Sequence, residues 1–520
     1  MSVRVFSGVK RFPSPFRNIS QSRPVSKMTT IQLPLTPAEK LFRQCLLDCR
    51  KEMQSVPGME DLVLRWTGGW VRDKLLGVQS HDIDVALSTM TGWEFGQALQ
   101  TFIKEHGAKY EEQAAKQGFN SQVKDIHKIA ANPDKSKHLE TITTRMFGID
   151  VDFVNLRKEV YNHENRHPQV EFGTAEEDAL RRDATVNALF YNLDTQAVED
   201  FTHRGLEDMK NKIIRTPLAP YQTFKDDPLR VLRLIRFACR LQYEIEATAK
   251  EAMKDQTIHE ALRLKISRER VGVEIGKIMA GPDPYTGLKY VNDFDLYFTV
   301  FADPSTPPTD DSIDASHAVI AYDGLQRVLD EKSSICLSLR PKEDQALSWF
   351  LAAYTSWYKS SAKAYQASRE GIKATNSMSK VLKDAIDLRP SIVEAVQSVN
   401  DDKAVRGDVG MTLRQCREAW RSHVLFSLLC DIVEQDFSTA TDRYQKFVAY
   451  VHDQDLEAAY AVPPILKGNE IKKALGDPKG GPWLKNAVDE LARWQFNHPK
   501  GTREEAIEMI SGKRSEFGLG

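Results

Sequence analysis

The sequence predicts an α+β fold, in which a small N-terminal mixed-sheet head is followed by an all-α neck, body and tail. From Leu62 to residue 156, short apolar runs alternate with turns, which is typical of a sheet with few helices. From Glu176 to the C-terminus, apolar residues recur at the period of an α-helix. No apolar run approaches the roughly 18 residues that a membrane span needs, so we expect no membrane segment.

The first 38 residues have a composition of their own. They are rich in serine, lysine and arginine, and the first acidic residue of the chain is Glu39. A basic, acid-free start of this kind is typical of a mitochondrial presequence, and a plain disordered basic tail is the alternative. Translation from a second start at Met28 would leave out every lysine and arginine of these 38 residues. We therefore expect a mitochondrial form and a cytoplasmic or nuclear form.

The elements of the head follow in order from residue 62. We expect five of them, namely a strand at 62–67, a turn and helix at 68–77, a strand at 81–87, a helix at 90–106 and a strand at 147–156. The polar, lysine-rich stretch 111–140 lies before the last strand, and we expect it to be a mobile loop.

These patterns divide the chain into four parts. We expect a leader at 1–38, the head at 39–175, a helical neck at 176–300, and a helical body and tail at 301–520. The proline-rich stretch 302–314 indicates a loop or linker at the last boundary.

Asp82 and Asp84 form the first chemical motif, in the stretch HDIDVAL. Alternate side chains of a strand share a face, so both carboxylates point one way while Ile83 and Val85 point into the core. Two carboxylates about 6–7 Å apart along a strand can share hard cations such as Mg²⁺. A pair of such ions would activate an attacking hydroxyl and hold the leaving phosphates.

A glycine turn precedes this acid pair. Gly68 and Gly69 end a strand and open a helix in the stretch TGGWVRD. Exposed N–H groups at a positive helix terminus suit a triphosphate, and Arg72 can reach the same phosphates. The alternative is a tight turn beside solvated acids, but the succession of turn, helix and acid pair favours a nucleotide site.

Two further groups of polar residues are candidates for the same site. Asp150 and Asp152 repeat the alternation on a second strand. Asp152 is the better candidate for a third metal ligand, and a solvated edge strand is the alternative. In the stretch RRDATVNAL, Arg182 suits a phosphate or sugar and Asp183 suits a ribose hydroxyl or the arginine itself. Taken alone, this stretch would equally suit a structural ion pair, and we expect Asn187 to bond backbone.

The stretch DDPLRVLRLIRFACRL, residues 226–241, predicts a helix with an arginine at every third position near its start. Asp227 would cap the helix and Pro228 would be its first residue. The arginines are then either solvated or part of a binding site, and they are Arg230, Arg233 and Arg236.

Five motifs, in this order and spacing, resemble those of the class II tRNA nucleotidyltransferases, the CCA-adding enzymes of the polymerase β superfamily. They are GGWVRD with HDID, RRDATVNA, GLEDMKNKIIRTP, DDPLRVLRLIRF and ISRERVGVE, and they lie within residues 60–280. The ANPDKSKHLET block and the arginine-rich leader are similar to the fungal members. Bacterial-type poly(A) polymerases share the five motifs.

The resemblance implies a nucleotidyltransferase head with defined roles for its residues. Asp82 and Asp84 would bind catalytic Mg²⁺, and Gly69 and Arg72 would hold the nucleotide phosphates. Arg182 would contact the incoming nucleotide, and the residues beside it would favour ribose. The GLEDMKNKIIRT stretch would be a hinge between head and neck, and the ISRERVGVE stretch would brace the neck helices.

The resemblance also implies that Asp227 and Arg230 read the incoming base, with Arg233 and Arg236 lining the same pocket. A carboxylate beside a guanidinium matches the amino group and ring nitrogen of cytosine and adenine. Guanine and uracil would leave buried polar groups unpaired, at about 1–3 kcal/mol each. Many relatives carry glutamate where this chain has Asp226, which is the one departure from the pattern.

The implied activity is the addition of C, C and A to the 3′ end of tRNA from CTP and ATP, with Mg²⁺ as cofactor. A poly(A) polymerase of the same superfamily is the first alternative, and an inactive RNA-binding scaffold is the second. The glycine turns and lysines of residues 465–495 would suit an RNA backbone or a solvated helical hairpin. We expect a monomer that binds tRNA and no membrane.

Overall fold

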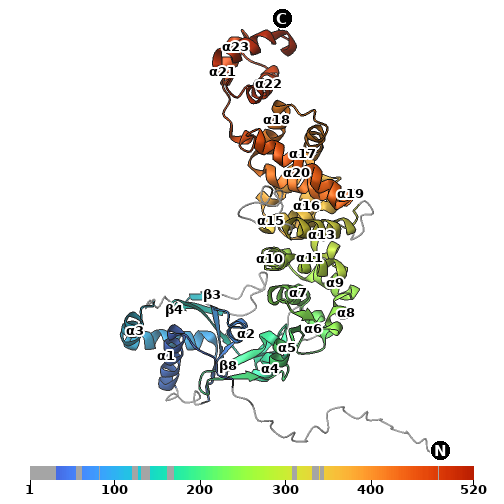
Figure 1. Ribbon diagram of the computed structural model, residues 1–520. Coiled ribbons are helices and arrows are strands. Elements are labelled where there is room, and N and C mark those ends of the chain that lie inside the picture. The colour runs from blue at the N-terminus through green and yellow to red at the C-terminus, as the bar shows by residue number, and fades with distance from the viewer. Residues whose placement is uncertain are drawn as a thin grey trace, which may run out of the picture.

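The computed structural model describes residues 31–53, 61–80, 82–119, 127–129, 141–160, 169–306, 313–330, 339, 345–477 and 479–519. Figure 1 shows a head of strands and helices beside the base of an elongated column of helices, with the C-terminus at the far end of the column. The expected mixed-sheet head followed by a helical region is confirmed.

The head is built on one mixed sheet of seven strands. Their order is β3-β4-β5-β2-β1-β8-β9. Strands β2 and β5 run parallel, and the other neighbouring pairs run antiparallel. The strands are β1 Leu64–Thr67, β2 Asp82–Leu87, β3 His127–Ile129, β4 Thr141–Met146, β5 Ile149–Asn155, β8 Leu189–Asn192 and β9 Ala197–Asp200.

The alternation along β2 decides which face of the sheet is the core. Ile83 and Val85 are fully buried, in the same apolar cluster as Phe42 of α1 (Pro37–Met53) and Phe95 of α3 (Gly92–Lys116). The residues between them therefore point to the opposite face. Helix α2 (Gly69–Leu75) follows β1 directly after the glycine turn.

Two expected boundaries of the head were wrong. Helix α3 runs to Lys116 because Tyr110 and Ala114 continue its buried face, so the first part of the expected loop is helical. The remainder of that loop, apart from β3, lies largely outside the described residues. Residues 31–36, which we assigned to the leader, belong to the head, because Leu33 is buried and the carbonyl of Ile31 accepts a hydrogen bond from the sheet. Residues 1–30 of the expected presequence lie outside the described residues.

The sheet continues past residue 175, where we expected the head to end. Strand β8 pairs with β1, and β9 pairs with β8. Leu189 and Tyr191 face the head core, whereas Phe190 faces a smaller cluster on the other side with Ala179. A short run that is apolar on both faces does not distinguish a strand from a helix, which explains why a helix was expected.

The column is formed by helices α5 to α23, while α4 packs against the head sheet. One apolar core extends from Ala184 to Phe496, so the proline-rich stretch at 302–314, of which 307–312 lie outside the described residues, does not divide it. The helices are α4 Ala175–Leu180, α5 Gly205–Asn211, α6 Pro220–Asp226, α7 Arg230–Leu241, α8 Ala247–Met253, α9 Gln256–Lys265, α10 Arg268–Met279, α11 Pro284–Asp293, α12 Tyr297–Phe301, α13 Ser316–Asp330, α15 Gln345–Ala353, α16 Ser361–Gly371, α17 Asn376–Asn400, α18 Arg406–Cys416, α19 Trp420–Glu434, α20 Phe437–Asp453, α21 Gly468–Ala474, α22 Trp483–Asn497 and α23 Arg503–Gly512. We use "neck" for α6 to α12 and "tail" for α21 to α23.

Small elements complete the fold. The paired strands β6 (Arg157–Val160) and β7 (Gln169–Phe172) follow β5 in the chain, and the paired strands β10 (Ile213–Ile214) and β11 (Glu244–Ile245) flank α6 and α7 in the chain. The tail has an apolar cluster of its own around Ile471, Leu491 and Ile510. Among the described helices, none is both long and apolar enough to span a membrane.

Candidate active site

Four carboxylates lie on one face of the two parallel strands. In the register of β2 and β5, Asp82 is opposite Asp150 and Asp84 is opposite Asp152. Strand β5 is internal, between β4 and β2, so the alternative of a solvated edge strand is wrong. The hydroxyl of Thr143 donates a hydrogen bond to Asp152 at 2.6 Å and orients its carboxylate.

The surroundings raise the pKa of both members of the acid pair. Burial raises the pKa of Asp84 to about 6, while Arg182 opposes the shift and Asp82 and Asp152 add to it. Burial also raises the pKa of Asp82, and the charges of Asp152 and Asp150 add to the effect. Carboxylates that repel one another and are partly removed from water are stabilised by a cation, so these residues fit a hard divalent ion.

The glycine turn lies against the acid pair. Gly68 has a φ of 72°, in the left-handed region that glycine adopts most readily. A Cβ atom built on Gly68 would lie 3.2 Å from Nη1 of Arg182 and 3.4 Å from Oδ2 of Asp84. The backbone of the turn, a carboxylate and a guanidinium therefore meet at one point, and a side chain on Gly68 would occupy it.

Arg72 is enclosed by protein groups. Its guanidinium donates to Asp73 at 2.7 Å and to the side-chain oxygen of Asn187, and it lies 5.8 Å from the ring centre of Phe237 in α7. Burial lowers the pKa of Arg72, and Asp73 opposes that shift. In this structure Arg72 joins α2 to the junction with the neck, and its contact with phosphates stays a prediction.

The RRD stretch is held by ion pairs. Arg182 donates to Asp178 from Nε and Nη2 at 3.1 and 2.8 Å, and to the backbone carbonyl of Asn187 at 3.0 Å. Asp183 accepts from Nε of Arg233 at 2.6 Å. Burial would raise the pKa of Asp183, but Arg233 outweighs burial and lowers it to about 2. The expectation that Asn187 bonds backbone was wrong, because its side-chain amide donates to Asp183 at 3.3 Å.

Helix α7 begins later than expected, at Arg230, with Leu229 before it. The residue before a proline avoids helical backbone, and Asp227 is extended, with φ −136° and ψ 96°. Its Oδ1 accepts from the backbone N–H of Leu229 at 3.1 Å, and its Oδ2 lies 3.6 Å from Nη2 of Arg270 in α10. Pro228 is therefore outside the helix. The expectation that Asp227 caps the helix was wrong, because the N-cap residue is Leu229 and no side chain caps α7. Asp227 instead combines a turn hydrogen bond with an ion pair. The neighbouring Asp226 accepts from the side chain of Gln222 at 2.6 Å.

The next two arginines of α7 are neutralised by a buried acid. The guanidinium carbons of Arg233 and Arg236 lie 5.5 and 4.3 Å from the ring centre of Phe237, within the range of a cation–π interaction. Glu274 of α10 accepts from Arg236 and lies 3.8 Å from Arg233. The solvated alternative is therefore wrong for these two arginines. Arg230 acts on the same junction, because its charge helps to lower the pKa of Asp183.

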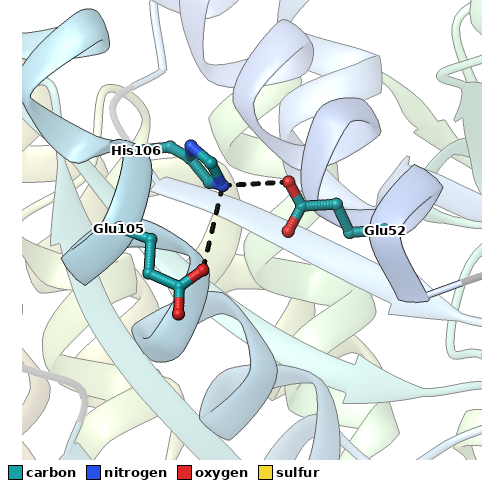
Figure 2. Close-up of side chains that lie close together, drawn as sticks. All are labelled: Glu52, Glu105 and His106. Carbon is teal, nitrogen blue, oxygen red and sulfur yellow. Dashed lines mark ion pairs between the residues drawn. The ribbon is translucent and has the colours of Figure 1, made fainter.

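A different group of possible metal ligands lies on the outer helices of the head. In the part of the chain that the structure describes, Glu52, Glu105 and His106 are the one group of three such side chains whose ligand atoms gather within 4.8 Å. Figure 2 shows Nε2 of His106 pointing at both carboxylates, at 3.0 and 3.9 Å. All three side chains are exposed, so they form a surface ion pair between α1 and α3. The carboxylate oxygens of Asp82, Asp84 and Asp152 do not meet this criterion of lying within 4.8 Å of one another.

The chain is similar along most of its length to fungal enzymes. It is 39% identical over 92% of its length to the mitochondrial CCA tRNA nucleotidyltransferase of Candida glabrata, of which it covers 96%. It is 37% identical over 86% of its length to the enzyme of the same name from Saccharomyces cerevisiae, of which it covers 87%. The chain belongs to the CCA tRNA nucleotidyltransferase family.

Other comparisons agree with this family. The Poly A polymerase head domain matches residues 64–215. The nucleotidyltransferase lcsQ of Purpureocillium lilacinum is 37% identical over 98% of this chain and 97% of its own. A CCA-adding enzyme without ligands has a TM-score of 0.62 at 17% identity, with 91% of this chain and 95% of that chain covered. The Thermotoga maritima CCA-adding enzyme in complex with tRNA has a TM-score of 0.56 at 18% identity, over 91% and 95% of the two chains. The solved structures share the fold.

Three residues at this family's head–neck junction were missed by sequence reasoning, namely Asp73, Asp178 and Arg240. Asp178 and Arg182 are four residues apart across the end of one helix, and that spacing is a recognisable signal for an ion pair. Asp73 lies 3.0 Å from Arg240, but the two belong to distant helices, so no local pattern indicates their contact.

Proposed function

We propose that this protein adds C, C and A in turn to the 3′ end of tRNA. The 3′ hydroxyl of the tRNA attacks the α-phosphate of CTP or ATP, a new phosphodiester bond forms, and pyrophosphate leaves. One observation carries the proposal in a chain of this family: Asp84, paired with Asp82 along β2, meets Gly68 and Arg182 at one point. That point combines a metal-binding carboxylate, a phosphate-binding turn and a guanidinium.

Asp82 and Asp84 would hold Mg²⁺ as the cofactor, with Asp152 as a third candidate ligand. Their oxygen-only donor set and their raised pKa values support this assignment. When bound, Mg²⁺ lowers the pKa of the attacking hydroxyl and neutralises charge on the departing pyrophosphate. Thr143 holds Asp152 in a fixed orientation beside Asp84.

The nucleotide would lie between the head and α7. Gly69 and its turn would bind the phosphates through backbone N–H groups, together with Arg182. Asp227 and Arg230 would read the base. Arg72 would contact the phosphates as well, and its pairs with Asp73 and Asn187 fix the position of α2. The arginines Arg233 and Arg236 would support the base-reading end of α7 through their pairs with buried acids.

The experiment that tests this function is a primer-extension assay. Purified protein is incubated with Mg²⁺, a tRNA that lacks CCA, and each labelled nucleotide alone and in pairs. Addition of C, C and A and then arrest is the expected result. A long tail made from ATP alone would identify a poly(A) polymerase, and absence of incorporation would identify an RNA-binding scaffold.

Binding of Mg²⁺ should depend on pH. The pKa of Asp84 is raised to about 6, above the usual value of about 3.9, so a proton competes with the metal below pH 6. The apparent dissociation constant of Mg²⁺ should rise about tenfold per pH unit below 6 and stay level above 7. The ionised carboxylate also costs stability as pH rises through 6, and Mg²⁺ should offset that cost.

Two measurements check this prediction. Calorimetric titration gives the affinity between pH 5 and 8, and thermal unfolding should show a larger upward shift with Mg²⁺ at pH 7.5 than at pH 5. Asp84→Asn should remove both effects. A Mg²⁺ affinity that is flat from pH 5 to 8 in the unmodified protein would contradict the assignment.

We also propose a mitochondrial form of the full chain and a cytoplasmic or nuclear form that starts at Met28. A chain that starts at Met28 keeps Ile31 and Leu33, which contact the head, and Thr36, which caps α1 by pairing with Glu39. It should therefore unfold at the same urea concentration as the full chain.

A chain that starts at Glu39 should be less stable, by about 2–4 kcal/mol, because it loses the burial of Leu33 and the cap from Thr36. Urea unfolding followed by tryptophan fluorescence measures both truncated chains against the full chain. Equal stability of the Met28 and Glu39 chains would show that residues 31–38 contribute nothing to the head.

The tail would bind the tRNA backbone. Helix α21 begins at Gly468 itself, and α22 begins at Trp483, after Gly480 and Gly481. Lys467, Lys472 and Lys473 lie on or beside the first of these helices, where they would attract phosphates. We propose that the protein acts as a monomer.

A further inference from the structure

Charged side chains connect α2 of the head to α7 of the neck. Helix α2 buries Trp70 in the head core, and α7 buries Leu232 in the separate core of the helical column. Between the two helices, Oδ2 of Asp73 accepts a hydrogen bond from Nη2 of Arg240 at 3.0 Å. Polar interfaces between parts of a chain permit relative motion more readily than apolar ones.

Two guanidinium groups share the carboxylate of Asp73. Its Oδ1 accepts from Arg72 at 2.7 Å, and its Oδ2 accepts from Arg240. The side chains of Asp73 and Arg72 are 8% and 3% exposed, whereas that of Arg240 is 46% exposed. Arg240 can therefore leave for water while Asp73 keeps its buried partner. Such a pair can break without leaving an uncompensated buried charge.

Arg240 lies at the opposite end of α7 from the residues proposed to read the base. The helix has 12 residues, with Arg230 first, so about 15 Å of helix axis separates Arg230 from Arg240. The chain just before α7 is tied to α10 through Asp227 and Arg270, and the middle of α7 is tied to α10 through Arg236 and Glu274. The second end is tied to the head through Asp73.

We propose that the ion pair of Asp73 and Arg240 is a latch that holds head and neck at the separation at which one nucleotide contacts both. The proposal rests on the proposed function, in which phosphates lie at the glycine turn of the head and the base lies at Asp227 and Arg230. Arg240 touches neither, so it is a positioning residue.

The latch has a consequence that a purely structural ion pair lacks. A ligand that contacts both head and neck binds more tightly when the distance between them is already correct before binding. A fragment that contacts only the head or only the neck gains no affinity from that distance. Loss of the latch should therefore weaken binding of CTP while leaving the binding of cytidine and of tripolyphosphate with Mg²⁺ unchanged.

Calorimetry or competition assays on the full chain, without tRNA, test this difference. Arg240→Gln should weaken CTP about two- to fivefold, which is the range for a half-exposed ion pair. Arg240→Glu faces Asp73 with a like charge and should weaken CTP further, about tenfold. Arg240→Lys should restore most of the affinity. Cytidine and tripolyphosphate should bind every variant as they bind the unmodified protein.

Arg50→Gln is the matched control. Arg50 pairs through two nitrogens with Asp194 inside the head, so its loss should lower stability and leave CTP affinity unchanged. The latch is refuted if Arg240→Glu weakens all three ligands alike, if neither Arg240→Gln nor Arg240→Glu changes CTP affinity, or if Arg50→Gln reproduces the loss. The extension of tRNA by the unmodified protein is measured separately, so a failed latch and a failed CCA assignment give different results.

Discussion

Asp82→Ala should abolish nucleotide incorporation, with a loss of about a thousandfold or more, because metal ions contribute several kcal/mol of charge stabilisation in such reactions. Asp82 lies on the polar face of β2, outside the apolar cluster that Ile83 and Val85 enter, so its removal leaves the core of the head intact. Affinity for tRNA should stay close to that of the unmodified protein. Incorporation of labelled CTP and a filter-binding assay with tRNA measure the two quantities on one preparation.

Asp150→Ala is the matched control for that loss. Asp150 lies opposite Asp82 in the register of the parallel strands and pairs with Arg145 at 3.4 Å. It carries the same charge on the same face, but it is not one of the proposed metal ligands. Incorporation by Asp150→Ala should stay within a few-fold of normal, as expected for an exposed surface ion pair. Equal losses in the two variants would refute the assignment of Asp82 as a specific ligand.

Asp227→Ala should relax base selectivity. Without the carboxylate, the unpaired amino group of cytosine or adenine no longer finds its acceptor, and the carbonyl of uracil or guanine no longer meets a repelling charge. We expect the preference for CTP and ATP over UTP and GTP to fall by about 10- to 100-fold, corresponding to about 1–3 kcal/mol. The ratio of kcat/KM values for the four nucleotides measures it.

Asp227 also accepts a hydrogen bond from the N–H of Leu229, so a second variant is needed to separate base reading from this local bond. Asp227→Asn keeps an oxygen that can accept from Leu229 but replaces the other carboxylate oxygen with a donor. It should melt close to the unmodified protein and still lose selectivity, whereas Asp227→Ala should also lose about 1 kcal/mol of stability with that hydrogen bond. Asp226→Ala, one residue earlier, is the control. Retained selectivity in Asp227→Asn would leave this residue with a structural role only, through Leu229 and Arg270.

Local patterns predicted the parts of the site that lie within single elements. The alternation of Asp82, Ile83, Asp84 and Val85 was sufficient to place two acids on one face, because a strand repeats every two residues whatever it pairs with. The glycine turn was equally local, since Gly68 needs a left-handed φ of 72°. The ends of elements were less well predicted, because burial against other parts of the chain extends α3 and adds β8 to the sheet.

The sequence by itself determined the acid face, the glycine turn and the family-type motifs, because each depends on residues that are near neighbours in the chain. Only the tertiary structure decided which charges meet. Arg233 pairs with Asp183 across 50 positions of sequence, and Arg240 pairs with Asp73 across 167. Which residues form such ion pairs depends on how the head packs against the neck, and the hydrophobic periodicity of the sequence does not predict that packing. The enclosure of Arg72 by Asp73, Asn187 and Phe237 also depends on this packing, so only the structure shows it.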